Sequence, residues 1–175
     1  MIIEKHIERK IQRDCFFITG TIKLDSEYFI KKIKAGVESN DNLTNQTFVR
    51  DQMTSWNYFV SDEKFINIIH CFMDFVDQEI NPNSYFLNNA WGYRLGSGGE
   101  TRFHDHAPNL WSGALYLNKH KQTLDFPDLN IKIVPNKGKF VLFSSFLQHG
   151  SLKHRELNAK YGISFNMGTI PIGGI

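Results

Sequence analysis

Cysteine is scarce in this sequence. Its 175 residues contain only Cys15 and Cys71, which lie far apart and form no Cys-x-x-Cys pair. Disulfide-stapled secreted domains and cysteine-rich zinc modules both need several cysteines at short spacings. The sequence therefore argues against both kinds of framework, and it favours the reducing environment of the cytoplasm.

Long apolar runs are also missing. No stretch approaches the ~20 apolar residues that a membrane-spanning helix requires. Residues 1–14, MIIEKHIERKIQRD, mix charged residues with short apolar pieces and lack the continuous apolar stretch of a signal peptide. We therefore expect neither export nor a membrane anchor, and we expect a cytoplasmic protein.

Neither sign of charge is in large excess. Twenty Lys and Arg residues against 18 Asp and Glu residues leave a formal net charge of +2. Because both signs are scattered along the chain, no extended positive field exists to attract nucleic acid or an anionic membrane. A small molecule or a protein side chain is the expected substrate, and a nucleic acid is less favoured.

Aromatic residues, in contrast, are plentiful. They make up 14% of the chain, with 15 Phe beside only 5 Pro, and 41% of all residues are hydrophobic. This is enough apolar material for one core, in a length typical of one domain. We predict a single domain over residues 1–175, with a helix-containing scaffold at 1–83 and a strand-built core at 84–175.

One strand and two helices are predicted in the scaffold. Residues 15–24 have the aromatic and β-branched content of a strand, Asp25 and Ser26 can cap a first helix, and Ser61 can cap a second. Turn-forming residues at 39–47 and 81–83 should end the two helices. Apolar residues recur at helical spacing at Phe29, Ile30, Ile33 and Val37, and again at Phe65, Ile68, Ile69, Phe72 and Val76.

The second half of the chain reads as antiparallel strands. Short aromatic or β-branched runs separated by Gly, Pro and Asn occur at 84–95, 101–106, 110–118, 130–135, 139–146 and 161–170. The FPD stretch at 126–128 and the LGSGG stretch at 95–99 are expected to be turns. Strands of this number behind two helices predict a mainly β (α+β) fold, namely a cupin-like jelly roll (a double-stranded β-helix) or a small barrel, with a helical layer on one face.

Three of the seven histidines suggest a metal site. His104 and His106 lie two residues apart at the end of a predicted strand, so both side chains can reach one ion while Asp105 points away. His149 ends an apolar run that we interpret as a buried strand. In a jelly roll, facing strands bring such residues to one mouth, and three ligands on one face of an octahedron leave open positions.

Two sets of metal ligands remain open at this point. The first is His104, His106 and His149, all neutral; in the second, Asp105 replaces His106 and restores the two-His, one-carboxylate set that is common for iron. The all-histidine set is favoured because neighbouring side chains on a strand point to opposite faces. It leaves more positive charge on the ion and should favour an anionic co-ligand. No partner pattern surrounds the remaining histidines, His6, His70, His120 and His154; His70 is expected in the core or an interface.

Three stretches of the sequence resemble one family. They are WGYRLGSGGETRFHDHAPNLWSGALYLN at 91–118, VPNKGKFVLFSSFLQHG at 134–150 and KYGISFN at 160–166. Their order and spacing are similar to those of the 2-oxoglutarate- and Fe(II)-dependent oxygenases of the prolyl-hydroxylase-like branch, and more narrowly to an uncharacterised group with a His-x-His…His pattern. The resemblance is close over residues 88–167 and loose before them.

The resemblance implies a dioxygenase, with Fe(II), 2-oxoglutarate and O2 as cofactors. It would hydroxylate an unidentified substrate while 2-oxoglutarate is converted to succinate and carbon dioxide. By the same resemblance, His104 and His106 take the first two metal positions and His149 the distal one. No catalytic residue beyond these ligands is needed, because the chemistry belongs to the metal and co-substrate. This agrees with the lack of a P-loop, a Gly-x-Gly-x-x-Gly motif and a Ser-His-Asp or Cys-His arrangement.

The family binds the far carboxylate of 2-oxoglutarate with an Arg at the start of the last strand, and the aligned residue here is Lys160. Lysine keeps the positive charge but loses the bidentate fork. Tyr116 can add a hydroxyl, Ser164 is a weaker candidate, and Arg155 is the alternative anchor if the alignment is shifted. Five further residues are candidates for the pocket or its approach: Asn88, Trp91, Tyr93, Asn109 and Trp111.

Two other functions compete with the oxygenase. A cupin-type jelly roll that binds metal without 2-oxoglutarate, acting as an isomerase, a different dioxygenase or a sensor, would also suit three histidines. A non-catalytic jelly roll would bind no metal. Free strand edges in such a fold would also allow a homodimer.

Overall fold

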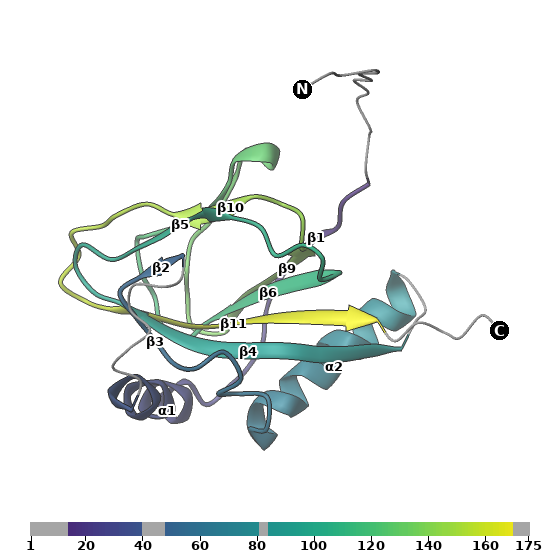
Figure 1. Ribbon diagram of the computed structural model, residues 1–175, viewed down its shortest axis with the longest axis horizontal. Coiled ribbons are helices and arrows are strands. Elements are labelled where there is room, and N and C mark those ends of the chain that lie inside the picture. Colours follow the sequence, from purple (N-terminus) through teal and green to yellow (C-terminus); the bar gives the residue numbers. More distant parts are fainter. Residues whose placement is uncertain (1–13, 40–47, 81–83, 170–175) are drawn as a thin grey trace, which may run out of the picture.

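A computed structural model describes residues 14–39, 48–80 and 84–169, which form two β-sheets and two longer helices (Figure 1). In spatial order, the six-stranded sheet contains β1 (Phe17–Thr21), β9 (Lys139–Ser144), β6 (Trp111–Tyr116), β11 (Lys160–Thr169), β4 (Tyr85–Leu95) and β3 (Gln52–Met53). The five-stranded sheet contains β2 (Val49–Arg50), β5 (Glu100–His104), β10 (His149–Ser151), β7 (Leu124–Phe126) and β8 (Ile131–Ile133). This mainly β arrangement with two helices confirms the predicted fold class.

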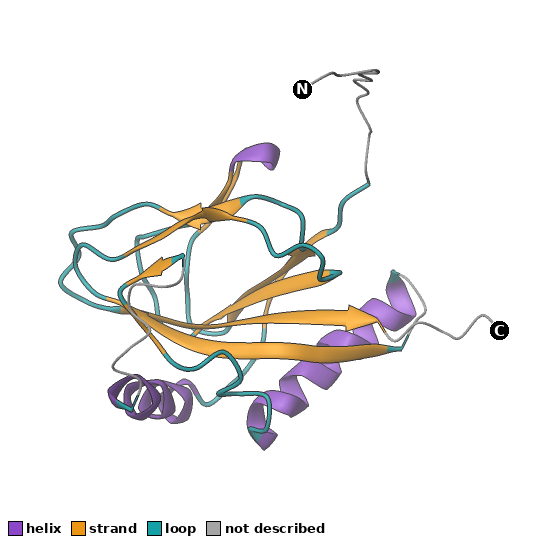
Figure 2. Cartoon of the chain, in the orientation of Figure 1, coloured by secondary structure: helices purple, strands orange, loops and turns teal. Residues whose placement is uncertain are grey.

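The two helices are α1 (Ser26–Glu38) and α2 (Glu63–Glu79), and both lie beside the larger sheet (Figure 2). The side chain of Asp25 caps α1 by accepting from the Tyr28 N–H. For α2 the cap is Asp62, which accepts from the Phe65 N–H, and not the predicted Ser61. An N-cap oxygen must reach the N–H two or three residues ahead, and Asp62 has that spacing to the first turn. Neither helix in the described residues is long and apolar enough to cross a membrane.

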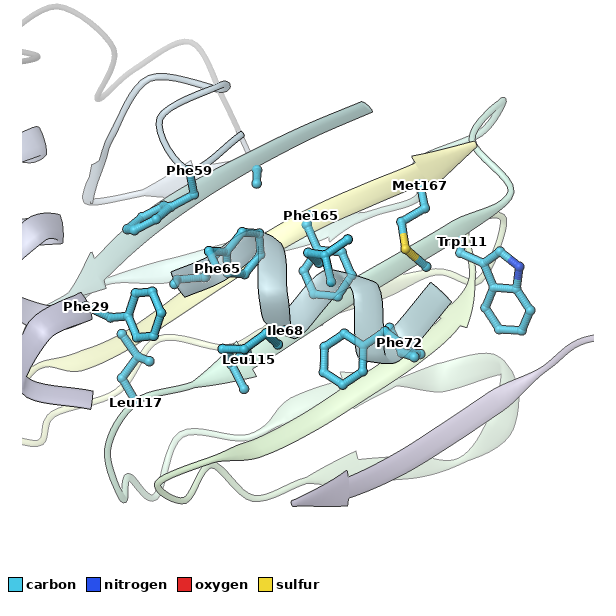
Figure 3. Close-up of a cluster of buried hydrophobic side chains, with 14 of the residues drawn as sticks. Phe29, Phe59, Phe65, Ile68, Phe72, Trp111, Leu115, Leu117, Phe165 and Met167 are labelled. Carbon is cyan, nitrogen blue, oxygen red and sulfur yellow. The ribbon is translucent and has the colours of Figure 1, made fainter. Parts of the chain in front are cut away.

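The main hydrophobic core fills the space between the helices and the larger sheet (Figure 3). From β11 it takes the alternate residues Ile163, Phe165 and Met167, because side chains alternate across a strand. Phe72 of α2 stacks on Phe165 with ring centroids 5.9 Å apart. The even-numbered residues of β11 are therefore left for the space between the two sheets, where Ser164 lines a cavity.

A second apolar cluster fills part of the space between the sheets. From the larger sheet it takes Ala114 and Val141, which are paired on β6 and β9, and from the smaller sheet Leu124 and Phe126 of β7. A third buried cluster, from β2, β3 and β4, consists of Val49, Met53, Trp91, Tyr93 and Leu95. Residues of both clusters line the cavity between the two sheets, together with polar side chains.

All six predicted strands are present as β4, β5, β6, β8, β9 and β11. The short strands β2, β3 and β7 were missed, and a 3-10 turn, η1 (Pro127–Leu129), overlaps the predicted turn. The prediction that His149 ends a buried strand was wrong, because β9 stops at Ser144 and His149 begins β10 in the other sheet. A turn closed by the Leu147 N–H and the Ser144 carbonyl separates the two strands.

Within the predicted scaffold at 1–83, β1, β2 and β3 pair with strands of the predicted core in the two sheets. The single-domain organisation stays a prediction. Residues 40–47 of the predicted loop at 39–47, the helix stop at 81–83 and His6 lie outside the described residues.

Candidate active site

Three histidines converge between the two sheets. His104 at the end of β5 lies opposite His149 at the start of β10, and His106 follows two residues after His104. The ligand atoms of the three side chains all lie within 4.8 Å of one another. Their ring centroids are 4.7 Å apart for His104 and His106, 4.5 Å for His104 and His149, and 5.0 Å for His106 and His149. The arrangement can hold one metal ion by three nitrogen ligands.

Backbone carbonyls orient two of the rings. His104 Nδ1 lies 2.7 Å from the Arg102 carbonyl oxygen, and His149 Nδ1 lies 2.9 Å from the Leu147 carbonyl oxygen. Because a carbonyl only accepts, Nδ1 must carry the proton in both rings, which leaves Nε2 as the free lone pair. The hydrogen bonds therefore prepare both imidazoles to bind metal through Nε2.

Burial keeps the three imidazoles neutral. It lowers the pKa of His104, and it lowers the pKa of His106 and of His149 to about 3, with a smaller contribution from repulsion between the rings. A neutral imidazole is the form that coordinates a metal ion. At neutral pH the cluster therefore needs no deprotonation before binding.

Asp105 points away from the cluster. Its exposed carboxylate accepts hydrogen bonds from Gln148 Nε2 at 2.8 Å and from the Ala107 N–H at 3.2 Å. This is the direction that strand alternation predicts for the residue between two inward-facing histidines. The structure thus brings together the all-histidine set and not the alternative set with Asp105.

Both the backbone N–H and the backbone carbonyl of His106 form hydrogen bonds. Its N–H donates to the Ser145 carbonyl at 2.8 Å, and its carbonyl accepts from Asn109 Nδ2 at 2.8 Å. Asn88 Nδ2 in turn donates to Asn109 Oδ1 at 2.8 Å. Asn88 and Asn109, which were candidates for the pocket, are therefore placed to position the loop that carries His106.

A cavity extends from the histidines into the space between the sheets, and Lys160 lines it. Only 1% of Lys160 is exposed, and its ammonium group donates to Ser151 Oγ at 3.1 Å. It forms no ion pair with any carboxylate of the described residues. Burial accordingly lowers the pKa of Lys160 to about 7. A buried cation without a counter-ion is costly, so the cavity is suited to receive an anion.

Two tyrosines line the same cavity as Lys160. Gly162 of β11 is paired with Tyr93 of β4 on one side and with Tyr116 of β6 on the other. A Cβ at Gly162 would lie 2.3 Å from the Tyr93 hydroxyl, so only glycine leaves room for that ring. The Tyr116 hydroxyl is buried and has no hydrogen-bond partner. One ammonium and an unpaired hydroxyl thus line one recess.

The other predicted residues divide into those inside and outside the cavity. Trp91 and Ser164 line it, whereas Trp111 packs in the core on the opposite face of the larger sheet. The alternative anchor Arg155 is exposed in the loop after β10 and does not line the cavity. His70 is exposed on α2, which contradicts the core alternative, and its place in an interface stays a prediction.

Sequence reasoning missed Ser151 and Thr101, which also line the cavity. Ser151 lies two residues after His149 on β10, so strand alternation alone would have placed it on the same face once β10 was known. His120 and His154 were thought to lack partners, yet their rings pack together with centroids 4.6 Å apart.

No family model and no curated protein matches this sequence. Solved structures do match it in shape. A viral collagen prolyl hydroxylase from Paramecium Bursaria Chlorella virus-1, in a 2-oxoglutarate complex, is 17% identical, with a TM-score of 0.69 over 88% of this chain and 96% of that chain. The chain has the fold of the prolyl hydroxylases.

Two further structures agree with this fold. A Pseudomonas putida prolyl-4-hydroxylase is 15% identical, with a TM-score of 0.63 over 88% of this chain and 92% of that chain. A Trichoplax adhaerens prolyl hydroxylase in complex with a hypoxia inducible factor peptide fragment is 15% identical, with a TM-score of 0.65 over 87% of this chain and 83% of that chain. The prolyl hydroxylase fold confirms the predicted jelly roll, and the His-x-His…His cluster lies within it.

Proposed function

We propose that the protein is an Fe(II)- and 2-oxoglutarate-dependent oxygenase that hydroxylates a small molecule or a protein side chain. In this proposal His104, His106 and His149 bind the metal, and Lys160 and Tyr116 bind the distal carboxylate. The observation that carries it is the meeting of a three-histidine cluster and a buried, uncompensated ammonium group in one cavity. The 2-oxoglutarate complex of the viral prolyl hydroxylase, which shares the fold, supports the choice of co-substrate.

The polar groups of the cavity fit a dicarboxylate. A carboxylate is an acceptor at both oxygens, and it would satisfy both the Lys160 ammonium and the orphaned Tyr116 hydroxyl. Ser164, on the β11 face that lines the cavity, is a weaker candidate contact. When bound, the metal, 2-oxoglutarate and O2 supply the oxidising chemistry, with succinate and carbon dioxide as co-products.

The side chains of this protein contribute binding and geometry. The Lys160 ammonium attracts the dianion, the Tyr116 O–H donates to it, and the apolar residues between the sheets exclude water from the cavity. The peptide bound by the Trichoplax neighbour supports a protein side chain as one substrate class. A cytoplasmic location and a homodimer stay predictions.

The competing function is a cupin-type metal protein that does not use 2-oxoglutarate. The neutral, all-imidazole cluster suits it equally well. Melting temperature with Mn(II), or with Fe(II) without oxygen, separates the two functions. The oxygenase requires that 2-oxoglutarate add stabilisation in the presence of metal, and that Fe(II) and oxygen yield succinate. Metal binding without either effect would favour the cupin-type function, and no metal binding would favour a non-catalytic protein.

Replacing Asp105 with Asn should leave metal affinity within about twofold, because its carboxylate faces Gln148 and not the histidines. His106→Ala should weaken the same binding by more than about tenfold, since it removes a ligand. Titration of both variants with Co(II), followed by its absorption spectrum, tests the ligand set. A large loss in Asp105→Asn with none in His106→Ala would instead support the set that contains Asp105.

Affinity for 2-oxoglutarate should depend on pH through Lys160. Its pKa is about 7, so the empty site holds an ammonium group below that pH and must take up a proton on binding above it. The dissociation constant should therefore rise by up to about tenfold per pH unit above pH 7. Calorimetry in buffers of different ionisation enthalpy measures the proton uptake. Lys160→Arg, charged at every pH tested, should remove this dependence, and an equally steep profile in that variant would assign the titration to another group.

A further inference from the structure

The cavity contains a second polar group, which the proposed binding of the distal carboxylate at Lys160 does not involve. The indole Nε1 of Trp91 is buried without a hydrogen-bond partner, although the residue is only 3% exposed. Buried N–H groups are nearly always paired, and an unpaired one is costly. Trp91 also lines the same cavity as the three histidines. An acceptor brought by a ligand would satisfy this donor.

The strand register places Trp91 beside the metal cluster. On the larger sheet Trp91 is paired with Ser164, which is paired with Ala114 on its other side, and all three line the cavity. The Trp91 ring lies 5.8 Å from the ring of His106, centroid to centroid, in an edge contact. Trp56 packs edge-on against the same indole at 4.5 Å and limits its rotation. The donor is therefore held next to a metal-binding histidine.

The recess for the distal carboxylate lies one step further along the same strands. Gly162 is paired with Tyr93 on one side and with Tyr116 on the other, two residues from the Trp91 row. Two residues of a strand span roughly 6.6 Å. On the facing sheet, Ser151, which contacts Lys160, is likewise two residues from His149. Both sheets thus show one two-residue step between the distal recess and the metal cluster.

This step matches the length of the co-substrate. Four C–C bonds of about 1.5 Å separate the two carboxyl carbons of 2-oxoglutarate, which are therefore roughly 5 Å apart when extended. With its distal carboxylate at Lys160 and Tyr116, the 2-oxo acid end reaches the row of Trp91. An indole N–H can only donate, and the 2-oxo acid end offers only acceptors.

We propose that Trp91 is a positioning residue whose indole N–H donates to the metal-side carboxylate of 2-oxoglutarate and so sets how the 2-oxo acid end meets the metal. This inference rests on the proposed function. Hydrogen bonds to an ionised acceptor are about twice as strong as neutral ones. Loss of the N–H should therefore weaken 2-oxoglutarate binding by about ten- to a hundredfold.

The test compares Trp91→Phe with Trp111→Phe, a matched control at a buried indole outside the cavity. Calorimetry with Mn(II)-loaded protein gives the affinities for the metal and for 2-oxoglutarate. Trp91→Phe should weaken only the affinity for 2-oxoglutarate, leave metal affinity within about twofold and shift the charge-transfer absorption of the Fe(II) complex without oxygen. Combined with Tyr116→Phe, the two fold-changes should multiply, because the groups contact opposite ends of the ligand.

The smaller ring of Phe can disturb packing. Replacement of Trp91 by 3-benzothienylalanine removes the N–H but keeps the ring shape, so it should reproduce the Trp91→Phe result if the N–H is responsible. Wild-type protein that binds metal but not 2-oxoglutarate would overturn the proposed function itself. Normal 2-oxoglutarate affinity in both Trp91 variants would overturn only this inference and assign the donor to another ligand. An equal loss of metal affinity would also overturn it, because Trp91 would then act by supporting His106.

Discussion

Lys160→Met is expected to stabilise the ligand-free protein and, at the same time, to abolish its stabilisation by 2-oxoglutarate. The ammonium group is buried with one hydroxyl contact and no ion pair within the described residues, whereas methionine fills a similar volume without charge. Replacing buried charge by apolar atoms can stabilise a protein by roughly 1–4 kcal/mol. If Lys160 instead stabilised the fold, Lys160→Met would destabilise the ligand-free protein.

The gain from Lys160→Met should depend on pH in a defined direction. Burial lowers the pKa of Lys160 from 10.5 to about 7, so the unfolded chain binds more protons than the folded one between these values. Stability of the wild type therefore rises with pH in that window, and the advantage of the variant shrinks. The full advantage is present below pH 7, where the folded protein must bury the charge.

Thermal melts near pH 6.5, with Mn(II) and with or without 2-oxoglutarate, measure both effects. Ligand at a hundred times its dissociation constant should stabilise the wild type by about 2.7 kcal/mol and the variant not at all. Lys153→Met, at an exposed lysine of the loop after β10, is the matched control and should change neither quantity. A lower melting temperature for Lys160→Met, or an unchanged response to 2-oxoglutarate, would refute the role of Lys160 as the anion anchor.

His149→Ala is expected to weaken binding of Fe(II), Co(II) or Mn(II) by more than about a hundredfold. Even outer-shell partners of metal ligands typically contribute ten- to a hundredfold, and this change would remove a ligand. The nitrogens of His104 and His106 remain close, but two ligands two residues apart at the end of β5 cannot form the three-point face. The effect of 2-oxoglutarate on melting should be lost with the metal, since its 2-oxo acid end would have no ion to bind.

Equilibrium titration under anaerobic conditions, with the metal measured by absorption or calorimetry, gives this loss directly. His70→Ala is the control, because His70 is exposed on α2, outside the cavity. The folded state should survive His149→Ala, since removal of a neutral ring leaves no unpaired charge, and circular dichroism verifies this. Unchanged metal affinity in a folded His149→Ala protein would exclude the three-histidine centre.

The amino-acid sequence by itself was sufficient for the elements whose signal is local. Helix α2 follows from its apolar stripe and acidic N-terminus, and the longer strands follow from their aromatic and β-branched runs. The two-residue spacing of His104 and His106 also predicted that both face one site and that Asp105 faces out. Periodicity and side-chain alternation are properties of a single segment, so they can be inferred before the chain folds.

Only the tertiary structure decided which segments meet. The two-residue strands β2 and β3 exist because β5 and β4 pair with them, and no local pattern marks them. His149 starts a new strand because β10 pairs with β5, which places it opposite His104. Strand pairing is a long-range interaction whose register depends on the whole sheet.

The same reason applies to the recess around Lys160. From sequence, a solvated charge at a strand start is the less favoured alternative for Lys160, and Tyr116 can be an ordinary core residue. Burial of the lysine, the unpaired tyrosine hydroxyl and the contact with Ser151 arise only when β11, β6 and β10 come together. Desolvation of a side chain depends on all of its neighbours at once. The sequence therefore determined which polar side chains the protein has, and the tertiary structure determined which of them are buried away from water.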